Sequence, residues 1–210
     1  MSLFERLFFR TRVVPAKNGR DLRLTRWFGR WEIHGDNGTY QTGAYMDGLW
    51  TNVLKTFPKT HAPKSVLLLG VGMGGTFRVI LRRWPNARIT GVDWEPDLLD
   101  LGRRLGVSQD NPRVTFVSGD AAAVVPGLQG PFDLICVDLF NNTERGVEIA
   151  DAVRAPALQD ACQRLLAPGG TVALNHFRSP DAAAGWDARF PSFTRMRYES
   201  NTVTLYRKLP

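Results

Sequence analysis

Glycines and carboxylates stand at the ends of aliphatic runs in this 210-residue chain, where they could bind a nucleoside. Gly70, Gly72 and Gly74 end or follow the strand-like run in "SVLLLGVGMGG". Glycines in such a turn adopt positive φ angles readily and expose backbone N–H groups to a bound molecule. Asp93 lies 21 residues after Gly72 (93 − 72 = 21). An acid at this distance is placed to accept hydrogen bonds from a ribose diol.

Two further carboxylates end later strand-like segments. In "VTFVSGDAAAVV", Asp120 could accept a hydrogen bond from an adenine amine while the N–H of Ala121 meets a ring nitrogen. Alternatively, Asp120 is a helix N-cap. Asp138 follows "FDLICV" and is the candidate catalytic base, because a positioned carboxylate can accept a proton from an attacking amine or hydroxyl. A structural strand-end carboxylate is the alternative for Asp138. Trp50 and Trp94 could each stack on the nucleoside or belong to the core.

The histidines and cysteines predict neither a metal site nor a disulfide. His34, His61 and His176 have no metal-ligand spacing with either cysteine. Cys136 lies in an apolar strand-like run and Cys162 in a helix-like one. We therefore expect a protein of the reducing cytoplasm, with no metal ion.

Most of the net charge of +7 comes from the first 30 residues, which carry eight basic and two acidic side chains, or 8 − 2 = +6. A basic face can attract phosphates, but this chain shows no nucleic-acid-binding motif. We expect a solvated arginine-rich surface rather than a nucleic-acid partner. No apolar run approaches the ~18 residues of a membrane helix, so no membrane partner is expected.

Strands and helices that alternate along the chain must position these residues. Alternating units predict a parallel sheet with helices on both faces, an α/β doubly wound, Rossmann-like fold. We expect residues 1–45 to form a small N-terminal antiparallel β-sheet and residues 46–210 a Rossmann-like nucleoside-binding domain, with an antiparallel pair around Ser200. The expected strands are 65–70, 87–92, 113–117, 132–140 and 171–177, and the expected helices 46–57, 75–84, 96–105, 120–125 and 150–166.

Over about residues 20–178 the chain resembles the class I methyltransferase folds and, more closely, the spermidine synthase (polyamine aminopropyltransferase) family. The resemblance is carried by "GTYQTG", "PKSVLLLGVGMGG", "VDWEPD", "NPRVTFVSGDA" and "FDLICVD". It implies that Gln41 contacts the nucleotide, that Asp93 binds the ribose and that Asp120 lies on the adenine side. It also implies that Asp138 helps to deprotonate the attacking amine.

The chain departs from that family at the acids that would bind a cationic amine. Met73 replaces an aspartate of the family's glycine loop, and the segment "MDGLWTN" retains only Asp47, with Trp50 and Thr51 in place of Tyr and His. A dicationic amine needs carboxylates to offset its desolvation. We expect Met73 to present its thioether to the tail of the ligand, so that S-adenosylmethionine is disfavoured less than in spermidine synthases.

Three functions are open on these residues. The first is a spermidine-synthase-like transferase that uses S-adenosylmethionine or decarboxylated S-adenosylmethionine, with an altered small-molecule acceptor, amines included. The second is an S-adenosylmethionine-dependent methyltransferase in which Arg78 reaches the carboxylate of the methionine tail. The third is a non-catalytic nucleoside-binding homologue.

Aromatic residues near the N-terminus predict a homodimer that buries part of residues 1–45, as the family resemblance also implies. A small exposed sheet should not carry this much apolar side chain. The residues concerned are Phe4, Phe8, Phe9, Trp27 and Phe28.

Overall fold

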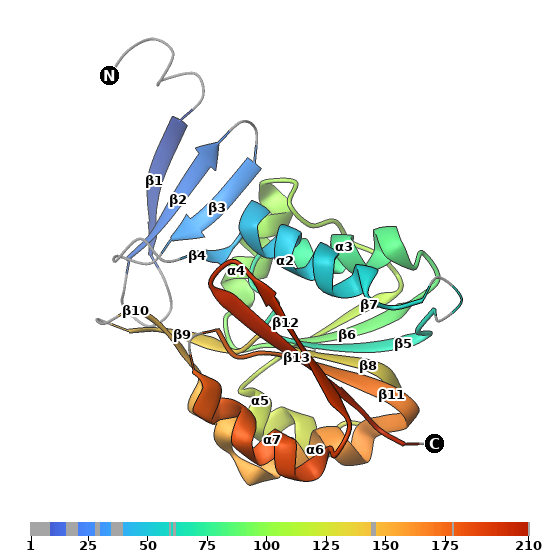
Figure 1. Ribbon diagram of the computed structural model, residues 1–210. Helices are drawn as coiled ribbons and strands as arrows, with labels where there is room; N and C mark the ends of the chain where they lie inside the picture. The colour runs from blue at the N-terminus through green and yellow to red at the C-terminus, as the bar shows by residue number, and fades with distance from the viewer. Residues whose placement is uncertain are drawn as a thin grey trace.

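A seven-stranded sheet forms the centre of the protein in the computed structural model (Figure 1). The structure describes residues 9–15, 21–27, 30–34, 40–58, 60, 62–143, 146–177 and 179–209.

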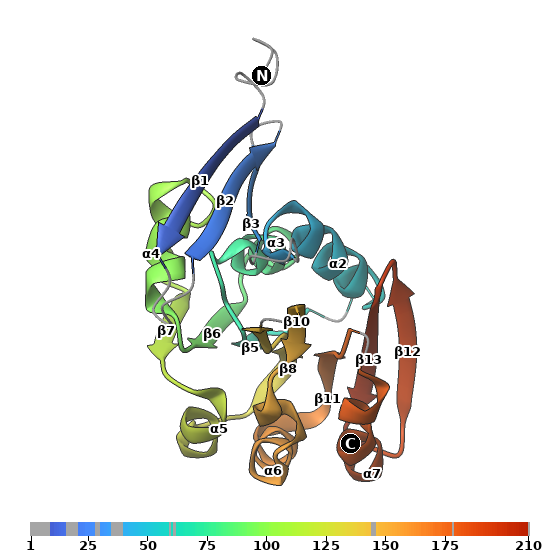
Figure 2. The ribbon, with the colours of Figure 1, turned by 90° about the vertical axis from the view of Figure 1, so that its left-hand side faces the viewer.

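The strand order of the central sheet is β12-β13-β11-β8-β5-β6-β7, seen along the sheet in Figure 2. Five neighbouring strands are parallel, and the last two of the chain join antiparallel at one edge. The strands are β5 (Ser65–Leu69), β6 (Arg88–Asp93), β7 (Val114–Ser118), β8 (Phe132–Val137), β11 (Leu166–Asn175), β12 (Phe193–Tyr198) and β13 (Asn201–Arg207). The alternating pattern therefore predicted the doubly wound α/β class and the terminal antiparallel pair correctly.

Helices cover both faces of this sheet (Figure 2). On one face lie α2 (Ala44–Lys55), α3 (Gly75–Arg83) and α4 (Pro96–Arg104). On the other lie α5 (Ala121–Val124), α6 (Pro156–Leu165) and α7 (Ala184–Arg189). Leu67 and Leu69 pack into one apolar core, while Val66 and Leu68 pack into the other. β5 is therefore buried on both faces, as its unbroken aliphatic run indicates.

Two expected elements end differently in the structure. The strand expected over 132–140 stops at Val137, and the chain then forms a separate hairpin of β9 (Phe140–Thr143) and β10 (Gly146–Ile149). The helix expected over 150–166 is divided into a 3₁₀ turn (Asp151–Arg154) and α6. Pro156 explains this break, because a proline disfavours the helical conformation of the residue before it. Ala155 is accordingly extended, with φ −67° and ψ 123°.

A four-stranded antiparallel sheet precedes the central domain, in the order β1 (Phe9–Pro15), β2 (Asp21–Trp27), β3 (Arg30–His34) and β4 (Tyr40–Thr42). The antiparallel sheet expected there is confirmed. Phe4, Phe8 and Phe28 lie outside the described residues, as do the side chains of Phe9 and Trp27. The homodimer therefore stays a prediction. No helix among the described residues is long and apolar enough to cross a membrane.

Candidate functional site

The glycine loop between β5 and α3 is shaped by three left-handed residues. Gly70, Gly72 and Gly74 have φ angles of 88°, 52° and 81°. A Cβ atom on Gly70 would lie 2.1 Å from the carbonyl oxygen of Asp138, so only glycine fits there. The loop is thus pressed against the residue that follows β8, and the two chain segments are held in register by contact between their backbones.

Asp93, at the end of β6, holds this loop in place. Its Oδ2 accepts hydrogen bonds from the backbone N–H groups of Val71 (2.7 Å) and Gly72 (2.8 Å), and its Oδ1 accepts one from Glu95 (2.9 Å). A carboxylate has about four acceptor positions, so three are already used. Asp93 lies at the expected place, but only one position, on Oδ1, stays open for a ribose hydroxyl. Simultaneous acceptance from both hydroxyls of a diol would require sharing these bonds.

The remaining residues expected at the nucleoside lie on the same rim. Trp94 directly follows Asp93, and its side chain is 51% exposed, which excludes the core alternative and leaves its ring open for stacking. Asp120 caps α5: its Oδ1 accepts a hydrogen bond of 2.6 Å from the N–H of Ala122. This is the capping alternative considered for Asp120, although its Oδ2 accepts no hydrogen bond from any described residue. Ala121 is buried at the start of α5.

Asp138 is held between two uncharged donors. The indole Nε1 of Trp50 donates to Oδ2 and the amide Nδ2 of Asn175 donates to Oδ1, each at 2.9 Å. Burial raises the pKa of Asp138 to about 6, although the two hydrogen bonds lower it. The nearby Asp93 adds a repulsion in the raising direction. A carboxylate with this pKa is ionised at neutral pH and can accept a proton, as a general base requires.

Two residues of this arrangement have roles that the sequence did not predict. Trp50 was expected to stack on the nucleoside or to lie in the core. It is fully buried, and its donor reaches a partner 88 residues away. Asn175, at the end of β11, was not singled out at all. The position of Asn175 at a strand end, next to the strand that carries Asp138, was the available signal.

An ion pair lies beside the first residue of α3. Arg78 on α3 pairs with Oδ2 of Asp47 on α2, while a Cβ atom on Gly75 would lie 2.5 Å from Oδ1 of Asp47. Asp47 and Trp50 are three residues apart on α2 and so lie on one side of that helix. Thr51 donates its hydroxyl back to the carbonyl oxygen of Asp47. Asp47, which is one of the few acids that this chain shares with the spermidine synthase pattern, therefore lies at the glycine loop and is paired with Arg78.

The expectation for Met73 is wrong. Its side chain has no exposed surface and packs in a cluster that includes Leu24, Ile33, Leu98 and Leu101. Residue 73 therefore joins the glycine loop to the N-terminal sheet and to α4 instead of facing a ligand. Gly72 and Gly74, on either side of Met73, both have left-handed backbone conformations. These conformations turn the Met73 side chain in a direction that the sequence of the loop did not predict.

The structure describes only the backbone of Gln41 but both the backbone and the side chain of His176. Gln41 lies in β4, but its side chain is outside the described part of the structure. His176 is buried, and its Nε2 lies 2.9 Å from the hydroxyl of Thr204. Burial lowers the pKa of His176, which favours the neutral ring. Among the described residues, no group of three or more His, Cys, Asp or Glu side chains could hold a metal ion.

Comparison with known proteins places the central domain in a family. Residues 66–170, half of the chain, match the family model described as a methyltransferase domain. Trans-aconitate 2-methyltransferase of Streptomyces avermitilis is 37% identical over 122 residues, which is 56% of this chain and 42% of that protein. Polyamine aminopropyltransferase of Chromobacterium violaceum is 29% identical over 132 residues, or 62% of this chain and 46% of that protein.

A solved structure shares the fold over nearly the whole chain. A probable spermidine synthase from Corynebacterium glutamicum superimposes with a TM-score of 0.73 over 94% of this chain and 80% of that chain, at 17% identity. The chain spans less than half the length of the two curated relatives named above. Relatives named as methyltransferases and as aminopropyltransferases thus both match.

Proposed function

We propose, since this chain belongs to the methyltransferase-domain family, that it transfers a methyl group from S-adenosylmethionine to a small nucleophilic acceptor. Asp138 is the base of this reaction. The observation that carries the choice of methyl transfer is the ion pair of Asp47 and Arg78 beside the glycine loop.

The residues at the strand ends fit an adenosyl group. The glycine loop brings the partly exposed backbone of Gly70 and Gly72 to this rim, where a bound molecule can approach it closely. Trp94 offers an exposed ring for the adenine, and the remaining acceptor position on Asp93 suits one ribose hydroxyl. The free Oδ2 of Asp120 suits the exocyclic amine. Together these groups would hold the nucleoside without contact to its variable tail.

The ion pair suits a tail that carries both charges. The methionine part of S-adenosylmethionine ends in an ammonium and a carboxylate, and decarboxylated S-adenosylmethionine ends in an ammonium alone. Asp47 can bind the ammonium and Arg78 the carboxylate, so that each charge of the pair finds an opposite charge. With an ammonium alone, the guanidinium would remain as a neighbouring like charge.

Asp138 completes the reaction by accepting a proton. When bound, S-adenosylmethionine supplies a methyl carbon attached to a sulfonium, which an acceptor with a lone pair can attack in line. The hydrogen bonds from Trp50 and Asn175 fix both oxygens of Asp138. Each oxygen keeps a lone pair, and one of them can take the proton that the acceptor loses. Fixed geometry of this kind contributes to the rate mainly by positioning.

Calorimetry with S-adenosylmethionine and its decarboxylated form tests the proposal. The variant Arg78→Met should weaken the binding of S-adenosylmethionine by about tenfold to a hundredfold, because one charge-assisted contact is lost. The same variant should leave the decarboxylated form unchanged or bound more tightly. Arg82→Met is the matched control, because Arg82 is exposed on the same helix and has no ion pair with a described residue. Equal affinity of Arg78→Met and the wild type for S-adenosylmethionine would contradict the proposal.

Aminopropyl transfer from the decarboxylated form is the second candidate, and the carboxylate of Asp47 favours it, because Asp47 could leave Arg78 and bind a primary ammonium. A wild-type protein that binds the decarboxylated form far more tightly than S-adenosylmethionine would select this function. Met73→Asp is a poor probe of the choice, because it would place an unpaired carboxylate in an apolar cluster.

A further inference from the structure

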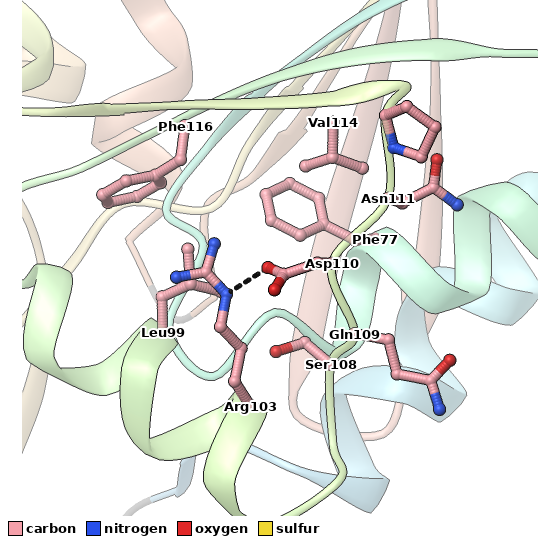
Figure 3. A pocket seen from close by; sticks show the side chains of 10 residues that line it. Phe77, Leu99, Arg103, Ser108, Gln109, Asp110, Asn111, Val114 and Phe116 are labelled. Carbon is pink, nitrogen blue, oxygen red and sulfur yellow. Dashed lines mark ion pairs between the residues drawn. The ribbon is translucent and has the colours of Figure 1, made fainter.

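A cavity lies at the edge of the central sheet, beside β7, and Asp138 is not among the residues that line it. Its volume is about 320 Å³, at the lower end of the range for small-molecule sites. Four apolar side chains from α3, α4 and β7 form its inner wall: Phe77, Leu99, Val114 and Phe116 (Figure 3). The loop from Ser108 to Pro112 supplies the polar side. The cavity therefore combines an apolar body with a polar rim, as ligand sites generally do.

One buried polar group in this cavity has no partner. Ser108 is only 6% exposed, and no described residue forms a hydrogen bond with its Oγ. Figure 3 shows this side chain among those that line the cavity. Buried hydroxyl groups are nearly always hydrogen-bonded, because an unsatisfied one loses its hydration without replacement. A ligand with an N–H or O–H group could supply the missing bond.

The charges at the rim favour a cation. Arg103 binds Oδ1 of Asp100 (2.7 Å) and Oδ1 of Asp110 (2.9 Å), so two carboxylates share a single guanidinium. The formal charge of this group is −1, and the Asp110 side chain is 87% exposed at the mouth of the cavity. A cationic group near the mouth would balance the excess, while the aromatic rings of the wall suit an apolar body.

We propose that this cavity binds a small primary amine with an aromatic or aliphatic body, and that its occupation changes the affinity of the glycine loop for the adenosyl ligand. The wall of the cavity and the loop are in contact. A Cβ atom on Gly74 would lie 2.8 Å from Cβ of Ser108 and 2.9 Å from Cδ1 of Leu99. Displacement of Ser108 or Leu99 by a ligand therefore acts directly on the residue that precedes α3. Binding at the two sites is then coupled, and the coupling is reciprocal.

Benzylamine is a suitable probe of the cavity. In calorimetry and NMR titration, it should bind the wild-type protein saturably, shift the signals of Val114 and Leu99, and stay bound in the presence of saturating S-adenosylhomocysteine. It should also change the affinity for S-adenosylhomocysteine by at least threefold. Benzyl alcohol, which lacks the charge, should bind more weakly, and Asp110→Asn should weaken benzylamine about fivefold but leave benzyl alcohol unchanged.

Val114→Phe should fill the cavity and abolish benzylamine binding. Thr115→Phe is the matched control, because successive residues of a strand face opposite sides and Thr115 is exposed. Thermal melting of both variants verifies their folding, and the NMR map of the wild type tests the site independently if Val114→Phe fails to fold. The proposal is overturned by displacement of benzylamine by S-adenosylhomocysteine, by signal shifts confined to other residues, or by no saturable binding. An unchanged affinity for S-adenosylhomocysteine would overturn the coupling.

Discussion

At the proposed nucleoside end of the site, Asp93 and Asp120 accept hydrogen bonds from backbone N–H groups, whereas at the proposed transfer end Asp138 is held by two side chains. Two of the three donors to Asp93, the N–H groups of Val71 and Gly72, belong to the glycine loop itself, so the carboxylate holds the shape of the loop. The donors to Asp138 come from α2 and β11, and they fix a carboxylate that directly follows the end of β8.

Because of this difference, the carboxylate of Asp93 stabilises the conformation of the chain, whereas the carboxylate of Asp138 can accept a proton. Three of the acceptor positions of Asp93 are used by the protein, and little is left for a ligand. Asp138 accepts one hydrogen bond at each oxygen, is half-buried, and has a pKa of about 6. Two aspartates at strand ends on either side of β5 can therefore look equivalent in sequence and still differ in the role that their partners permit.

Gly70→Ala should have the largest effect, because Gly70 is where the two ends touch. Its φ of 88° and the 2.1 Å approach to the Asp138 carbonyl combine backbone strain with overpacking. We expect a loss of about 3–5 kcal/mol in the free energy of unfolding. Gly106→Ala is the control, since its φ is 70° but nothing lies within 4 Å, and it should cost about 1–2 kcal/mol. Equal losses in chemical denaturation would show that the two ends are not in contact.

Asp93→Ala should act next most strongly, on both the loop and the ligand. Loss of the bonds to Val71 and Gly72 should lower the free energy of unfolding by about 2–4 kcal/mol. S-adenosylmethionine, its decarboxylated form and 5′-methylthioadenosine should all weaken alike, because they share the nucleoside. Calorimetry measures this, with the exposed Asp97→Ala as the control. Unchanged affinities would place the nucleoside elsewhere.

The transfer end should respond to pH. The pKa of Asp138 is raised from about 3.8 when unfolded to about 6 when folded, so its protonated form is favoured in the native protein. Its contribution to stability is therefore full below pH 3.8, at about 3 kcal/mol, and is lost as the pH rises through 6. About 2 kcal/mol of this loss falls between pH 4.5 and 7.5. Denaturation of the wild type relative to Asp138→Asn at pH 4.5 and 7.5 measures this loss. Activity should change in the opposite direction and rise as the pH passes about 6. An activity that does not change with pH across this range would contradict the role of Asp138 as the base.

Asp120→Ala should have the smallest effect. Loss of the cap on Ala122 should cost about 1 kcal/mol in the free energy of unfolding. Loss of Oδ2, which accepts no hydrogen bond from a described residue, should also weaken the binding of 5′-methylthioadenosine, by about fivefold for one hydrogen bond. A stability loss without any change in affinity would reduce Asp120 to a cap and sharpen the contrast with Asp138.

The sequence predicted the parts of this protein that depend on local pattern. Aliphatic runs bounded by glycine or aspartate located the parallel strands, and the carboxyl ends of such strands meet at one edge of a sheet. That geometry is why Asp93, Asp120 and Asp138 could be grouped from the sequence alone. A left-handed loop was also expected, because glycine adopts positive φ angles more readily than any other residue.

Side-chain direction and long-range partners could not be predicted in this way. Met73 lies between left-handed glycines, and its burial depends on α4 and on a sheet far away in sequence. The bond from Trp50 to Asp138 joins residues 88 positions apart. The α7 segment was not predicted as a helix, because its six residues form little more than one turn and depend on packing of Trp186 against the sheet.

Because of the hydrogen bond from Trp50 to Asp138, the protonation of this carboxylate can be followed by optical spectroscopy. The indole of Trp50 is fully buried, and its only described hydrogen-bond partner is this carboxylate. The charge on Asp138 therefore acts directly on the chromophore, and a change in that charge alters the electric field along the indole ring. The contribution of Trp50 to the absorption and fluorescence of the six tryptophans should therefore depend on whether the proton is on the carboxylate, without any added dye.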